Sequence, residues 1–99
     1  MSLDQLRCFV AVSDTGTTHA AAALLHLSQP PLSRHIRALE DELGVALFER
    51  TPRGMTLLPA GKVLLDRARS ILAAVEAAAR EARHATDAPA PDPGLEGQG

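Results

Sequence analysis

The segment 28–40, which reads SQPPLSRHIRALE, constrains the fold more strongly than any other part of this chain. At about 100° per residue, its apolar side chains fall within a sector of about 60° on a helical wheel. They are Leu32, Ile36 and Leu39, followed beyond the segment by Leu43. This spacing predicts a helix over 29–43 that buries one face and ends at Gly44.

The opposite face of this helix is polar and basic. Its residues are Pro30, Ser33, Arg34 and Arg37. Asp41 shares the face more than a turn beyond Arg37, and its carboxylate would repel phosphate. We therefore expect only the first half of the helix to enter a DNA groove. A solvated pair between Arg37 and Asp41 is the alternative, but it leaves Gln29, Ser33 and Arg34 unexplained.

Two shorter helices are predicted before this one. Ser2 and Gln5 form a capping-box pattern at the start of the first helix, and Gly16 ends it. Its core side comprises Leu3, Leu6, Phe9 and Val10. Thr17 or Thr18 can cap a second helix over 19–25, and 26–28 form the turn into the third. A short helix, a turn and a helix with a basic outer face are typical of proteins that read the DNA major groove.

The segment 45–58 changes period and predicts a β-hairpin. Residues 47–48 and 56–58 resemble two short strands around a type I turn over 51–54, with Pro52 second and Gly54 fourth. This hairpin, a wing, would carry Arg53 at its tip and Arg50 at its base. An arginine at such a tip suits a narrow minor groove or a phosphate; a solubilising loop arginine is the alternative.

A long helix is predicted from Pro59 to about Ala85. Its apolar residues recur at heptad spacing, which favours pairing with a second copy or another domain. The predicted dimerisation residues are Leu64, Leu65, Ala68, Ile71, Leu72, Val75, Ala78 and Ala82. The stripe could instead cover the small N-terminal core, but about 39 Å of helix is too long for that alone. The expected units are 1–58, a DNA-binding domain; 59–86, the dimerisation helix; and 87–99, a flexible tail rich in proline and glycine.

Composition excludes several classes of function. The chain has 99 residues, two phenylalanines and no tryptophan or tyrosine, which favours a mostly α-helical core. The formal net charge is −2, so nucleic-acid binding must rest on local charge. The single cysteine, Cys8, fits a buried structural thiol, and the histidines lack metal-ligand spacing. We expect no cofactor, metal or catalytic activity, no membrane span and no signal peptide, hence a cytoplasmic protein.

The motifs LDQLRCFVAV, AAALLHLSQPPLSRHIRALEDELGVALFERTPRG and TLLPAG strongly resemble the N-terminal region of LysR-type transcriptional regulators. The resemblance covers residues 1–85. It implies a winged helix-turn-helix followed by a long helix that dimerises the protein. It places Gln29, Pro30, Ser33 and Arg34 toward the major groove and Arg53 near the minor groove. The family's larger inducer-binding domain has no counterpart here, so no small-molecule ligand is expected.

Some positions depart from the family pattern. Thr18 replaces an aromatic residue, His19 a threonine or serine, and Leu58 a threonine that caps the long helix. Pro31 stands where alanine is common. With Pro30 and Pro31 in the second and third helical positions, the Ser28 hydroxyl has no N–H to accept, which suits it to phosphate instead.

These features predict a homodimer that binds a pseudo-palindromic operator in double-stranded DNA. Arg34 is the strongest candidate for reading a base, because its guanidinium can bond both N7 and O6 of guanine. Gln29 can pair with adenine, and Pro30 can pack on a thymine methyl group. Backbone contacts are expected from Thr17, Thr18, Ser28, Ser33 and Arg37. A module that pairs with a full-length relative through the long helix is the alternative function; DNA binding by the homodimer separates the two.

Overall fold

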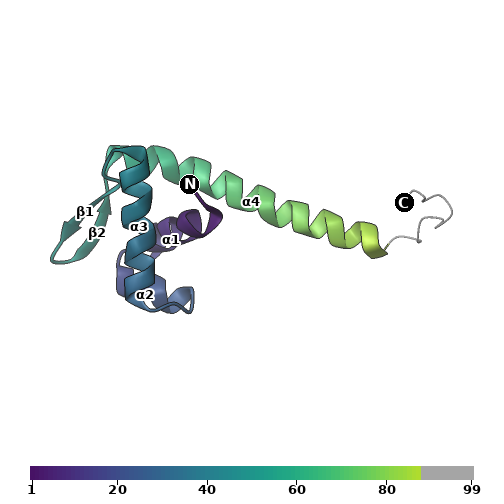
Figure 1. The fold of residues 1–99 in the computed structure, drawn as a ribbon, viewed down its shortest axis with the longest axis horizontal. Helices are drawn as coiled ribbons and strands as arrows, with labels where there is room; N and C mark the ends of the chain where they lie inside the picture. The colour runs from purple at the N-terminus through teal and green to yellow at the C-terminus, as the bar shows by residue number, and fades with distance from the viewer. Residues whose placement is uncertain (88–99) are drawn as a thin grey trace.

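The computed structural model describes residues 1–87, which form four helices and one β-hairpin (Figure 1). The elements are α1 (Leu3–Thr15), α2 (Thr18–Leu24), α3 (Gln29–Leu43), β1 (Phe48–Thr51), β2 (Gly54–Leu57) and α4 (Pro59–Asp87). The first three helices pack together, the hairpin projects from them, and α4 extends away as a long arm. The mostly α-helical prediction is confirmed.

The core lies where α1, α2 and α3 meet. Its largest fully buried side chains are Phe9, Leu32, Ile36, Leu39, Leu47, Val12 and Cys8. Phe9 and Phe48 contact each other at a centroid distance of 5.3 Å, which joins the hairpin to α1. Two core predictions are wrong: Leu3 is 39% exposed and Leu43 is 37% exposed. Both lie in the terminal turn of a helix, where the apolar stripe runs past the neighbouring elements.

The helix ends follow the predicted capping chemistry. The Ser2 hydroxyl accepts from the Gln5 backbone, and the Gln5 side chain accepts from the Ser2 backbone. Gly16 and Gly44 end α1 and α3 in the left-handed conformation, at φ of 85° and 73°. Thr17 caps α2 by accepting from the Ala20 backbone N–H. Consequently α2 runs one residue earlier than the predicted 19–25.

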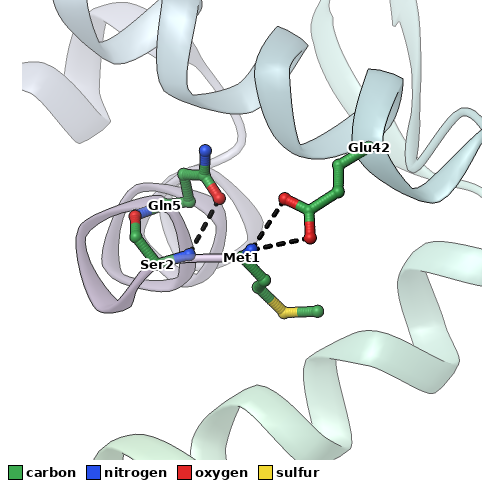
Figure 2. Close-up of polar contacts among 4 residues, drawn as sticks. All are labelled: Met1, Ser2, Gln5 and Glu42. Atoms are coloured by element: carbon green, nitrogen blue, oxygen red, sulfur yellow. Dashed lines mark hydrogen bonds and ion pairs between the residues drawn. The ribbon is translucent and has the colours of Figure 1, made fainter.

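The N-terminus is tied to the far end of α3. The Met1 ammonium group lies 2.6 Å from Oε2 of Glu42, and its neighbour Ser2 begins the capping box (Figure 2). This contact joins the start of α1 to the last turn of α3, which is the end opposite to Gln29.

The turn of the wing lies over residues 51–54 as predicted, but its first strand is longer than the predicted 47–48 and its second begins earlier than the predicted 56–58. The antiparallel register pairs Phe48 with Leu57 and Thr51 with Gly54, so Pro52 and Arg53 form the turn. Gly54 is thus the fourth residue of the turn, as predicted, and also the first residue of β2. Arg50 pairs with Met55 one step from the turn, which contradicts its predicted place at the base. In such short strands, pairing geometry outweighs the weak apolar pattern.

Helix α4 begins at Pro59 as predicted and continues to Asp87. Its first half packs on α1, and Arg69 donates to Asp14 at 2.6 Å. Ala68 is fully buried in the protomer's own core, with Leu64, Leu65 and Leu72 packed beside it. The stripe on α4 therefore covers the N-terminal core over its first half, and Ala68 cannot face a partner.

Asp87, the first residue of the predicted tail, is the last of α4, and 88–99 lie outside the described residues. Within residues 1–87, no helix is both long enough and apolar enough to cross a membrane.

Candidate nucleic-acid interface

The first half of α3 presents the polar face that the sequence predicts. Gln29, Pro30, Arg34 and Arg37 are exposed, and Ser33 is half-buried. Leu32 and Ile36 hold the helix from the opposite side and are fully buried. Apolar anchoring on one side and exposed donors on the other leave this half of α3 rigid and open to a ligand.

Charge is divided along α3. Its acidic residues, Glu40, Asp41 and Glu42, all lie in the last turn, while Arg34 and Arg37 precede them. Among residues 1–87 the ion pairs join Met1 to Glu42, Arg7 to Asp4 and Arg69 to Asp14. Arg37 and Asp41 are therefore not paired, contrary to the alternative reading of this face.

Ser28 begins α3 without a side-chain capping bond. Pro30 and Pro31 occupy the second and third helical positions, so the backbone there has no N–H to offer. The exposed Ser28 hydroxyl is left available to a ligand at the helix N-terminus, as the sequence predicts.

Gln29 is tied to the first turn of α2. The Thr18 hydroxyl donates to Oε1 of Gln29 at 3.3 Å, and Nε2 of Gln29 lies 3.1 Å from Nδ1 of His19. Sequence reasoning placed Thr18 on the DNA backbone and missed both contacts. Thr17 is half-buried beside them and caps α2.

The wing is held against the helix-turn-helix by its backbone. The Met55 N–H donates to the Gly16 carbonyl at 2.8 Å, which fixes β2 beside the α1–α2 turn. At the tip, the Arg53 N–H donates to the Thr51 hydroxyl at 3.2 Å, and the Arg53 side chain is exposed. The wing thus carries Arg53 outward on a fixed support.

Glu40 is a structural residue that sequence reasoning missed. Its Oε2 accepts from the backbone N–H groups of Leu47 and Phe48, at 2.8 and 3.3 Å. The carboxylate thereby joins the end of α3 to the start of the wing. An acidic residue beside the buried Leu39 was the available signal, but its partners lie across a loop and could not be read from spacing.

The predicted dimerisation residues do not share one environment. Leu64, Leu65, Ala68 and Leu72 contact the protomer's own core. Ile71 is 40% exposed, Val75 is half-buried, and Ala78 and Ala82 are exposed. Ile71 thus lies between core positions but is exposed itself, and Val75, Ala78 and Ala82 follow it toward the end of α4.

Cys8 lies on the buried face of α1 and is only 2% exposed. Burial, with a smaller contribution from the Asp4 carboxylate, raises the pKa of the Cys8 thiol above its ordinary value. A neutral, inaccessible thiol agrees with the structural role predicted for it.

Residues 3–62 match the model of the bacterial regulatory helix-turn-helix proteins of the lysR family. The chain belongs to the LysR family. Similar regulators include TfdT of Cupriavidus pinatubonensis, 51% identical over 85 residues, and ClcR of Pseudomonas putida, 53% identical over 76 residues. These matches cover 86% and 77% of this chain but 37% and 26% of the two relatives. The chain thus spans a minor part of the length of these LysR relatives.

Solved structures of LysR proteins share the fold. The CbnR_DBD–DNA complex aligns with a TM-score of 0.81 at 44% identity, covering 87% of this chain and 99% of that one. The BenM_DBD/catB site 1 DNA complex aligns with a TM-score of 0.86 at 36% identity, covering 90% and 100%. The winged helix-turn-helix prediction is confirmed, and the chain carries the DNA-binding domain of a LysR-family transcriptional regulator.

Proposed function

We propose that this LysR-family domain binds a two-fold-related operator as a homodimer and reads its sequence with the first half of α3. One observation carries the proposal: α3 exposes Arg34 and Arg37 ahead of its carboxylates, neither arginine has an ion-pair partner within residues 1–87, and fully buried side chains anchor the helix. Solved relatives of the same fold include DNA complexes. Such a regulator works in the cytoplasm, where bacterial DNA lies, and needs no catalytic group.

Specific roles follow from chemistry and position. Arg34 bonds N7 and O6 of a guanine, and Gln29 bonds an adenine edge. Pro30 packs on a thymine methyl group, and Arg53 on the wing enters the minor groove or binds phosphate. Phosphate contacts come from Thr17, Ser28, Ser33 and Arg37.

Dimerisation in this proposal uses α4 from Ile71 onward. Ile71 and Val75, with Ala78 and Ala82, continue the heptad stripe past the fully buried Ala68 and keep exposed or half-buried side chains. Two linked reading helices then contact half-sites about one helical turn apart.

The test is a titration of the 99-residue chain against DNA from upstream of its own gene, with competitor DNA and varied salt. Arg34→Ala should lower discrimination at one base pair by about 1–3 kcal/mol, whereas Arg67→Ala, an exposed arginine on α4, should leave the base preference unchanged. If Arg34→Ala keeps the same base preference as the parent, the proposed role of Arg34 is contradicted. A parent dimer that ignores DNA would overturn the proposal and favour the interaction module.

A further inference from the structure

Gln29 is the first residue of α3, and both polar atoms of its side chain already have a partner within the protein. The Thr18 hydroxyl donates to Oε1, and Nε2 lies within hydrogen-bond distance of Nδ1 of His19. Thr18 and His19 are the first two residues of α2. Two consecutive residues of α2 therefore hydrogen-bond the side-chain amide of the first residue of α3.

These two contacts leave the amide half used. A glutamine amide has two acceptor sites on oxygen and two hydrogens on nitrogen. One of each is taken by Thr18 and His19, so one acceptor and one donor remain. That pair is the set needed to bond N6 and N7 of an adenine at once.

The contacts also set the direction of the amide. Nε2 is only a donor, so the bond to His19 requires that Nδ1 carries no proton. With Oε1 on the Thr18 side and Nε2 on the His19 side, acceptor and donor face the ligand in the order that this tautomer of His19 selects. A reversed amide would present them in the opposite order and would fit a different base edge.

From this geometry we infer that Thr18 and His19 are positioning residues that determine the base preference of Gln29. The inference rests on the proposed function. The gain is preorganisation, because an exposed glutamine otherwise loses several rotatable bonds when it binds a base. Thr18 is half-buried, and the hydroxyl proton that it donates to Gln29 is not available to phosphate.

The packing of α2 against α3 does not depend on the two hydrogen bonds to Gln29. Ala21, Ala22 and Leu32 are buried between the helices, and the Leu27 N–H donates to the Ala22 carbonyl at 2.8 Å. Removal of the Thr18 hydroxyl or the His19 ring should therefore change the amide of Gln29 while the helices remain in place.

The experiment measures dissociation constants for the operator and for every single base-pair substitution in one half-site. The variants are Thr18→Val, which keeps the branched shape without the hydroxyl, His19→Ala and Gln29→Ala, with His84→Ala as an exposed-histidine control. Gln29→Ala should remove the preference at one base pair. Thr18→Val and His19→Ala should each reduce the preference at that same pair roughly two- to tenfold, should leave the Arg34 pair unchanged, and should add nothing in a Gln29→Ala background.

Three outcomes would overturn the inference while the parent still binds its operator specifically. Equal weakening on all sequences would make Thr18 and His19 phosphate contacts, and effects that persist without Gln29 would separate them from the amide. No preference dependent on Gln29 would remove the residue they position. If the parent protein itself shows no operator preference, the proposed function fails and the inference fails with it. Thermal unfolding of each variant establishes that it is folded.

Discussion

At the scale of single residues, Gly54 shows how closely the wing approaches the helix-turn-helix, and Gly44 offers a comparison in open space. Gly54 has a φ of 134°, and a Cβ there would lie 2.4 Å from the Gly16 carbonyl oxygen. That same oxygen accepts from Met55. Gly44 also has a positive φ, 73°, but a Cβ there would meet nothing within 4 Å.

This contrast predicts different costs for the same substitution. Gly44→Ala introduces backbone strain only, about 1 kcal/mol, whereas Gly54→Ala adds a clash with backbone and should cost about 3 kcal/mol. Urea unfolding of both variants measures the two losses. Equal losses would show that the wing yields freely at Gly16.

Cys8 predicts a dependence of stability on pH. Its folded pKa lies above the ordinary value of 9.0, so the unfolded chain ionises first. Stability from the neutral thiol is therefore present below about pH 9 and declines as pH rises past the unfolded pKa. Cys8→Ala should lower stability overall but should show a smaller decline between pH 8 and 10 in urea unfolding. An unchanged decline would assign it to other groups.

At the scale of elements, Glu40 links α3 to the wing. Its carboxylate accepts hydrogen bonds from the backbone N–H groups of Leu47 and Phe48, and a shorter side chain would leave these groups unpaired. We expect Glu40→Ala to destabilise the fold by about 2 kcal/mol. Glu49→Ala, on the exposed side of β1, serves as the control and should change stability by under about 0.5 kcal/mol. A comparable loss in both would contradict the linking role.

Prediction from the sequence succeeded where periodicity or capping was strong. Leu32, Ile36 and Leu39 determined the register of α3, and the Gly44 stop followed from its conformation. The strand bounds were less accurate, because four-residue strands carry too few alternations to set a register. The hydrogen bonds to Gln29 and those to Glu40 were missed because they join residues from different elements.

At the scale of the whole molecule, the apolar stripe of α4 contains both positions that pack on the protomer's own core and positions that remain exposed. The first half of α4 packs on α1 through the buried Ala68 and through the Arg69–Asp14 ion pair. Along the same stripe Ile71 is 40% exposed and Val75 is half-buried, and the end of α4 extends away from the other helices (Figure 1). Heptad spacing in the sequence could not divide the stripe, because period alone does not say which neighbour covers each position.

The central claim is that the reading face of α3 acts through a dimer held by the exposed stripe of α4 from Ile71 onward. The most direct measurement combines light scattering with operator titration for the parent, Ile71→Asp and Val63→Asp, the last being a 71% exposed control on α4. The account predicts that Ile71→Asp is monomeric and loses most operator affinity, while Val63→Asp remains a dimer that binds like the parent. A monomeric Ile71→Asp protein with undiminished operator affinity would contradict it.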